Sequence, residues 1–207
     1  MSLTLIIVIL TGLISYNCFQ DRGRFANLLH SPYQEKKSNQ YYRLLTSGFL
    51  HGGMGHLLIN MFVLFNFGEA IEMKFLEIFG EVMGRLNFLL LYLLTIIFAN
   101  IPTFLLHKNN PHFSSVGASG AVSGLVFVLI LFRPWAPLEL FFFIPIHAII
   151  LGVLFLAYSS WAAKKGGDRV DHVAHFGGAV FGFLFTIMLK PELFAQFLDA
   201  LQTNAPF

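Results

Sequence analysis

A serine and a histidine, each set among glycines, are the residues of this sequence best placed to do chemistry. Ser119 lies in the run Gly-Ala-Ser-Gly at residues 117–120, among side chains too small to shield its hydroxyl group. His175 lies in the run Ala-His-Phe-Gly-Gly at residues 174–178. A serine hydroxyl beside a histidine that takes its proton is a nucleophile for acyl transfer. Ser119 and His175 are therefore a candidate nucleophile and base.

Both glycine runs also have a purely structural explanation. Gly120 and Gly124 form a small-xxx-small pair that lets membrane helices pack closely, and a lone intramembrane histidine commonly bonds to a neighbouring helix. Gly178 and Gly182 would share a helix face with His175. Close approach of the two glycine pairs would bring the histidine within hydrogen-bonding reach of the serine. The serine and histidine together are a stronger indication of function than either residue alone.

A third run, His-Leu-Leu-Ile-Asn at residues 56–60, places an imidazole and a carboxamide on one helix face. His56 and Asn60 can both donate hydrogen bonds. Two such donors aimed at a developing oxyanion lower an acyl-transfer barrier by on the order of 3 kcal/mol each. The structural alternative is a polar contact between packed helices.

The composition predicts that a membrane bundle positions these residues. Of the 207 residues, 56% are hydrophobic and 12% charged, and the mean hydropathy is +0.70. A helix needs about 20 apolar residues to cross a bilayer. At that scale the chain divides into six spans, at about residues 3–19, 50–71, 86–106, 117–132, 138–162 and 170–189.

The predicted fold is all-α, a polytopic membrane bundle of six transmembrane helices that forms a single domain over residues 1–207. The break at residues 20–48 is a large first loop with room for structure of its own. The fourth span is short and follows a polar stretch at residues 107–112. Non-helical backbone at membrane depth is tolerated only where it is covered by protein or lines a wet cavity, and a hydrolase needs such water.

Charge and cysteine content exclude other classes. The formal net charge is +2, and no run of Lys or Arg could neutralise a series of phosphates, so nucleic acid is not an expected partner. Cys18 is the single cysteine and cannot form an internal disulfide, so we interpret it as a small apolar helix residue. The first residues have no basic n-region and no cleavage site follows, so the first span is expected to be retained.

The runs Gly-x-Ser-Gly in the fourth span, Ala-His-x-x-Gly-x-x-x-Gly in the sixth and His-x-x-x-Asn in the second resemble the motif set of rhomboid intramembrane serine proteases of the bacterial six-transmembrane type. The resemblance implies Ser119 as nucleophile and His175 as base. It also implies an oxyanion hole from His56, Asn60 and the backbone N–H of Ser119, with Gly117 supporting that loop. The implied reaction is cleavage of transmembrane segments of membrane proteins through an acyl-enzyme, in the bilayer and without metal or cofactor.

Two positions depart from the family pattern. Many rhomboids carry a Trp-Arg pair near the end of the first loop, where this chain has Tyr42 and Arg43; we interpret Tyr42 as the aromatic substitute and Arg43 as structural. Several rhomboids also place an aromatic residue one turn after the nucleophile, stacked on the catalytic histidine. Here that residue is Ser123, so another group has to orient His175.

The family topology places both termini inside and the serine near the outer face, and we expect that orientation in a bacterial cell (inner) membrane. The distribution of basic residues favours the reverse orientation. In the family topology the outer loops carry Arg22, Arg24, Lys36, Lys37, Arg43, Lys108, Lys164, Lys165 and Arg169, and the inner side carries Lys74, Arg85, Arg133 and Lys190.

Two other functions fit parts of the sequence. A channel or transporter for protons or metal ions would use His51, His56, His172 and His175 as relay or ligands. Against it, no span carries an acidic residue near its middle, and no His-Glu-x-x-His motif indicates a metalloprotease. His51 and His172 match structural or peripheral family positions and are not expected to be catalytic. An inactive rhomboid that binds membrane clients would commonly have lost the serine or the histidine, and this chain keeps both.

Overall fold

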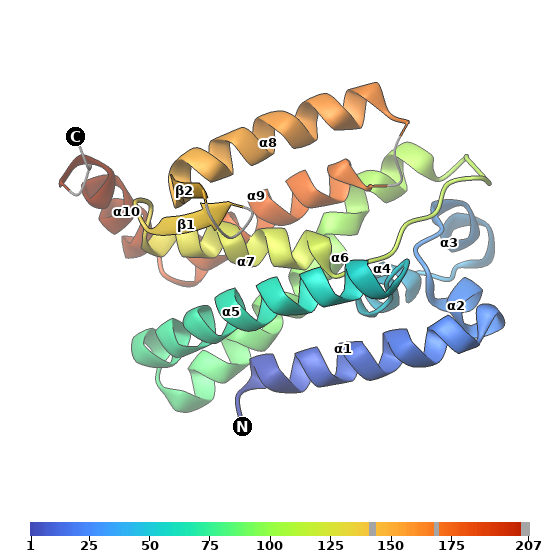
Figure 1. Cartoon of the computed structure of the whole chain (residues 1–207), viewed down its shortest axis with the longest axis horizontal. Coiled ribbons are helices and arrows are strands. Elements are labelled where there is room, and N and C mark those ends of the chain that lie inside the picture. Colours follow the sequence, from blue (N-terminus) through green and yellow to red (C-terminus); the bar gives the residue numbers. More distant parts are fainter. Residues whose placement is uncertain (141–143, 168–169, 204–207) are drawn as a thin grey trace.

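The structure is a computed structural model that describes residues 1–140, 144–167 and 170–203, and it forms a bundle of helices (Figure 1). Within these ranges five helices are long and apolar enough to cross a membrane. They are α1 (Leu3–Gln20), α5 (Met54–Phe79), α6 (Glu81–His107), α8 (Ala148–Lys165) and α9 (His172–Leu189). The fourth predicted span is the 14-residue helix α7 (Ser119–Phe132). The all-α polytopic bundle is thereby confirmed.

The predicted fifth span, residues 138–162, begins ten residues too early. The strands β1 (Pro137–Leu140) and β2 (Ile144–His147) pair antiparallel, and α8 starts at Ala148. Residues 141–143 of the predicted span lie outside the described residues. Hydropathy alone cannot separate an apolar hairpin from an apolar helix. Pro145, which lacks the N–H that a helix interior needs, was the local signal against a helix here.

The second span also differs, because α5 begins at Met54 and continues to Phe79 instead of ending near residue 71. Two acidic residues, Glu69 and Glu72, lie close to the predicted end, and Glu72 is buried within the helix. An acidic residue does not end a helix if its carboxylate finds partners.

Short helices occupy the first loop: α2 (Arg22–Leu28), α3 (Pro32–Ser38), α4 (Arg43–Thr46) and the 3₁₀ helix η1 (Ser47–Phe49). The sequence did not predict α10 (Glu192–Thr203), an amphipathic helix. Its buried residues Leu193 and Phe197 pack with residues of α7 and α9. The start of α1 lies toward the α10 end of the bundle, and the first-loop helices lie at the other end (Figure 1).

Helix α7 is the centre of the bundle and α8 is its edge. Ten of the 14 residues of α7 are buried, and the helix contacts α5, α6, α8 and α9. The buried residues of α8 are all small and include Gly152 and Ser159, whereas Val153 and Leu154 are more than half exposed. Figure 1 shows α8 along one side of the bundle, beside α9. Of the spanning helices around α7, α8 is the least buried and therefore the outermost.

The first turn of α1 is held by a carboxylate of α5. The backbone N–H of Leu3 donates to Glu72 Oε1 at 2.8 Å, and the N–H and hydroxyl of Thr4 both donate to Glu72 Oε2 at 2.8 Å. Arg85 Nη1 lies 3.5 Å from Glu72 Oε1. The first N–H groups of a helix have no intrahelical partner and favour a negative charge. Glu72 therefore caps α1 from a neighbouring helix.

We expect Glu72→Ala to lower the free energy of unfolding by about 3 kcal/mol, because it leaves two helix N–H groups and the Thr4 hydroxyl without their acceptor and removes one of the two carboxylates beside Arg85. An SDS titration of the protein in mild detergent measures this change. The matched control is Glu77→Ala on the same helix, where an exposed carboxylate pairs only with Lys74 and should contribute less than about 0.5 kcal/mol. Equal losses in the two variants would show that Glu72 does not cap α1.

Candidate active site

Ser119 and His175 lie 56 residues apart in sequence and are joined by a hydrogen bond. Nε2 of His175 lies 2.7 Å from Oγ of Ser119. Ser119 is the first residue of α7, and His175 lies in the first turn of α9. Both side chains are half-buried, so the pair is held by protein while remaining open to a cavity. A hydroxyl and an imidazole in this geometry can act as a nucleophile and its base.

Glycines bring the two helices together, as the sequence indicated. A Cβ added to Gly178 would overlap the carbonyl oxygen of Gly120, and its distance from the carbonyl carbon would be 2.7 Å. A Cβ on Gly182 would lie 2.7 Å from the Cα of Gly124. The backbones of α7 and α9 are thus in direct contact. Larger side chains at these positions would hold the helices apart and separate His175 from Ser119.

Gly117 lies between Ser119 and His56. Its φ of +135° is one that only glycine adopts readily. A Cβ at this position would lie 2.9 Å from Cε1 of His56 and 3.5 Å from Oγ of Ser119. The imidazole of His56 therefore occupies the space beside Gly117, and the loop before α7 brings ring and hydroxyl together.

Asn60 is buried one turn after His56, and its Nδ2 donates to the backbone carbonyl of His56 at 2.9 Å. A carboxamide nitrogen carries two hydrogens, so this bond uses one of the two donors. His56, Asn60, Gly117, Ser119 and His175 all line one cavity of about 1040 Å³. The structure thus gathers all five residues that the sequence singled out.

Three neighbours fix the segment that leads into Ser119. The backbones of His30 and Ser115 exchange hydrogen bonds of 3.1 and 3.0 Å, and the N–H of Gly117 donates to the carbonyl of Ser47 at 3.1 Å. His30 is itself fully buried and its Nδ1 lies 2.6 Å from Glu35 Oε1. The first loop therefore supports the backbone on which the serine stands.

Asp171 is the third neighbour, and the sequence analysis missed it. Its carboxylate accepts hydrogen bonds from Thr103 Oγ1 at 2.8 Å, Ser115 Oγ at 2.9 Å and the backbone N–H of Ala174 at 2.9 Å. It is the N-cap of α9 and links that helix to α6 and to the segment before Ser119. Its position just before an apolar run was a readable N-cap signal.

His51 is fully buried, and its Nδ1 lies 2.9 Å from Ser15 Oγ on α1. The Ser15 hydroxyl donates its one hydrogen to the carbonyl of Phe49 at 2.8 Å. In the bond between Ser15 and His51, the Ser15 oxygen is therefore the acceptor and the Nδ1–H of His51 is the donor. Burial, and secondarily His56, lowers the pKa of His51 to about 3, so its ring is neutral. Its ring centroid lies 4.9 Å from that of His56 in an edge-to-face arrangement. His51 thereby links α1 to the neighbourhood of His56.

Arg43 is buried in the first loop. Its Nη1 donates to the carbonyls of Ala26 and Leu29 at 2.7 and 3.0 Å, and its Nε donates to Gln40 Oε1 at 2.8 Å. Tyr42 is about half exposed, and the Arg43 guanidinium lies 5.7 Å from its ring centroid. These contacts tie α2 to α4 and lie within the first loop.

Aromatic rings of α8 and α9 contact His175. The ring of Phe155 on α8 stacks on it, with centroids 6.0 Å apart and planes at 26°. His172 meets it edge-on at 5.9 Å, and Tyr158 on α8 meets His172 edge-on at 5.3 Å. Ser123, one turn after Ser119, turns its hydroxyl back to the carbonyl of Ser119 at 2.8 Å. The sequence carried no signal for Phe155, which is one of many apolar residues in an apolar helix.

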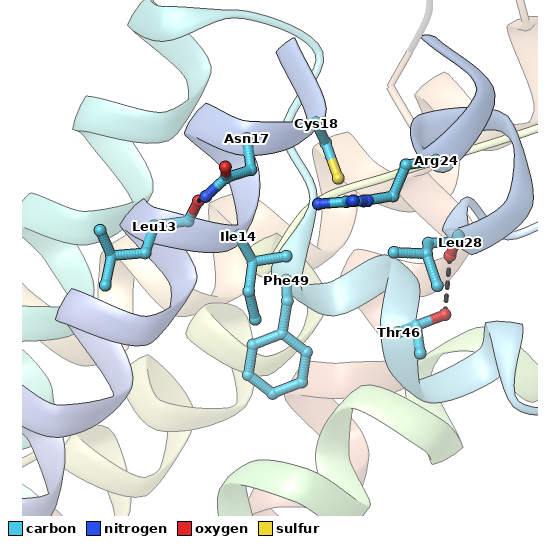
Figure 2. Close-up of a pocket in the computed structure, with 8 residues that line it drawn as sticks. All are labelled: Leu13, Ile14, Asn17, Cys18, Arg24, Leu28, Thr46 and Phe49. Carbon is cyan, nitrogen blue, oxygen red and sulfur yellow. Dashed lines mark hydrogen bonds between the residues drawn. The ribbon is translucent and has the colours of Figure 1, made fainter. Parts of the chain in front are cut away.

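A smaller cavity of about 290 Å³ lies apart from this site, between α1 and the first-loop helices (Figure 2). Its lining is mainly apolar and includes Leu13, Phe49 and Cys18, with Arg24 at its polar side. The Thr46 hydroxyl donates to the carbonyl of Leu28 at 2.8 Å across one wall. His56, Asn60, Gly117, Ser119 and His175 are not among the residues that line it.

Comparison with known proteins places the chain in a family. A family model of the rhomboid domain matches residues 38–192. "RHOMBOID-like protein 12, mitochondrial" of Arabidopsis thaliana is 29% identical over 150 residues, covering 69% of this chain and 45% of that protein. "Rhomboid-like protein 11, chloroplastic" of the same plant is 29% identical over 187 residues, covering 83% and 59%.

A bacterial relative matches over more of its own length. "Putative rhomboid protease YdcA" of Bacillus subtilis (strain 168) is 30% identical over 154 residues, covering 73% of this chain and 68% of that protein. The chain spans about half the length of the plant relatives it matches. Because the family model covers the helices that carry Ser119, His175, His56 and Asn60, the match includes the whole site. The chain belongs to the rhomboid family.

Proposed function

We propose that this protein is an intramembrane serine endopeptidase that cleaves transmembrane segments of other membrane proteins. The observation that carries the proposal is the 2.7 Å hydrogen bond between His175 Nε2 and Ser119 Oγ beside a large cavity. A hydroxyl paired with an imidazole in this way is activated for attack on a carbonyl carbon. The family membership supports a protease, and the relative from Bacillus subtilis carries that word in its name.

In the proposed reaction, Ser119 Oγ attacks the peptide carbonyl while His175 Nε2 takes the hydroxyl proton. The same proton then passes to the leaving amine, so the C–N bond breaks and an acyl-enzyme remains. Water, deprotonated by His175, attacks the ester and releases the second product. The cavity supplies room for that water next to the pair.

The oxyanion of each tetrahedral intermediate is proposed to lie between the loop at Gly117 and helix α5. The backbone N–H of Ser119 is at the N-terminus of α7, where helix N–H groups have no intrahelical acceptor. His56 lies against Gly117, and Asn60 has one amide hydrogen beyond the one that its helix uses. These three donors surround the place where negative charge develops.

The proposed substrates are membrane proteins presented within the bilayer. A peptide bond in a helix is shielded by intrahelical hydrogen bonds, so a substrate segment must unwind locally before Ser119 can attack. We assign the protein to a bacterial cell membrane with the serine end outward, an orientation taken from the family. No metal or cofactor takes part in the proposed steps.

The transporter interpretation loses support from the placement of the histidines. His51 pairs with His56, and His172 pairs with His175, so the four rings form two separate contacts. Among the residues that the structure describes, no three His, Cys, Asp or Glu side chains gather as a metal site. The histidine pairs instead border the serine loop and the serine itself.

The test is labelling of the detergent-purified protein with a fluorophosphonate probe, which reacts covalently with activated serines. We expect the wild-type protein to be labelled, and Ser119→Ala and His175→Ala to be unlabelled while eluting as folded protein in size-exclusion chromatography. Equal labelling of all three, or no labelling of a folded wild-type protein, would contradict the proposal and favour a client-binding rhomboid.

A further inference from the structure

The ring of a catalytic histidine has to be held in one plane so that its nitrogen stays aligned with the serine. On α7 the residue one turn after Ser119 cannot do this, because Ser123 is a small residue whose hydroxyl bonds to the backbone of its own helix. The aromatic face that lies against His175 comes instead from α8, where Phe155 is stacked at 6.0 Å and 26°.

Phe155 is itself fixed by further rings. Its ring centroid lies 6.3 Å from that of Phe127 on α7 and 6.0 Å from that of His175 on α9. Three residues further along α8, on the same helix face, Tyr158 meets His172 at 5.3 Å, and His172 meets His175 at 5.9 Å. Helix α8 thus contacts the base directly through one ring and indirectly through a second.

We propose that Phe155 is a positioning residue, which holds the imidazole plane of His175 so that Nε2 points at Ser119. The geometry of the dyad then depends on the packing of α8 against the bundle. The inference rests on the proposed function, since it concerns the efficiency of that same pair. Phe155 is not among the residues that line the cavity, whereas His175 is, so Phe155 acts through His175.

The contact between Phe155 and His175 depends on where α8 lies in the bundle. The fully buried residues of the helix are all small, and a Cβ added to Gly152 would meet Ile130 Cδ1 at 2.5 Å and Phe127 Cζ at 3.3 Å. Helix α7, by contrast, is buried on most of its surface. The nucleophile therefore stands on the central helix, while the ring that orients its base belongs to the outermost one. A shift of α8 away from the bundle would release His175 without moving Ser119.

The experiment compares Phe155→Leu, Phe155→Tyr and the matched control Phe181→Leu. Phe181 stacks on Phe98 of α6 at 4.4 Å and lies on the same helix as His175, so its loss removes a similar ring contact elsewhere. We expect fluorophosphonate labelling and kcat for a transmembrane substrate to fall three- to tenfold in Phe155→Leu, with KM unchanged, since aromatic stacking contributes at that level. Phe155→Tyr and Phe181→Leu should remain within twofold of wild type.

A second readout does not depend on catalysis. In protein with ¹³C-labelled histidine in micelles, stacking should shift the His175 ring protons upfield by ring current, and Phe155→Leu should abolish that shift, with His175→Asn used for assignment. An unchanged shift in Phe155→Leu overturns the inference, as does labelling in Phe155→Leu as fast as in Phe181→Leu. A wild-type protein that shows the ring-current shift but is not labelled would instead overturn the proposed function and leave the contact standing.

Discussion

The variants Ser119→Ala and His175→Asn are each expected to lower kcat for cleavage of a transmembrane substrate by roughly 10⁴-fold or more, and the double variant by no more than either alone. The physical reason is that the two side chains act as one unit. Without the imidazole the hydroxyl keeps its proton, and without the hydroxyl the imidazole has nothing to activate. Their 2.7 Å contact joins them in the resting structure.

Single-turnover cleavage measured by gel densitometry, with the substrate reconstituted in the same micelles, gives the three rates. Ser123→Ala is the matched control, because it removes a serine hydroxyl one turn away on α7 whose hydrogen bond goes to the Ser119 carbonyl. We expect that variant to stay within about threefold of wild type. Losses that multiply in the double variant would mean that Ser119 and His175 act independently.

Gly178→Ala is expected to destabilise the protein by about 3 kcal/mol or more and to reduce cleavage at least about 100-fold. The added methyl group would overlap the backbone of Gly120, and backbone cannot rotate aside as a side chain can. Helices α7 and α9 would have to separate, and His175 would move away from Ser119. An SDS titration and the cleavage rate measure the two effects.

The control for Gly178→Ala is Gly12→Ala on α1. A Cβ at Gly12 meets nothing within 4 Å, so the substitution tests the effect of alanine in a membrane helix without a clash. It should leave cleavage unchanged and alter stability by no more than about 1 kcal/mol, in the stabilising direction. A Gly178→Ala protein that behaves like Gly12→Ala would show that α7 and α9 do not need backbone contact.

Much of the bundle could be predicted because helices that cross a lipid bilayer are recognised by their length and hydropathy. The glycine runs at residues 117–120 and 174–178 also predicted their own packing, since close helix approach needs small residues at fixed spacing. The short α7 followed from the polar residues ahead of it. Span length, helix packing through glycines and the short α7 all depend on residues that are close together in the sequence, so the sequence predicts them.

Other features depend on what a segment meets in the folded chain. The hairpin of β1 and β2 has the same apolar composition as a helix, and α10 is too polar overall to register as a span although Leu193 and Phe197 repeat at helical spacing. Phe155 is one of 25 phenylalanines, and nothing in its neighbours along the chain tells that its ring faces a histidine. Only the packing of α8 on α9 distinguishes it.

The length of α7 bears on how deep in the membrane Ser119 lies. Fourteen residues extend about 21 Å, whereas the hydrocarbon core is about 30 Å thick, so a helix whose far end reaches the opposite surface begins roughly 9 Å below the nearer one. If α7 reaches that opposite surface, Ser119, its first residue, lies at this depth. A substrate helix standing upright beside it would present a bond about six residues inside its own membrane boundary. In a thinner bilayer the attacked bond would lie closer to the membrane boundary of the substrate, so under the proposed function membrane thickness becomes a determinant of the cleavage position.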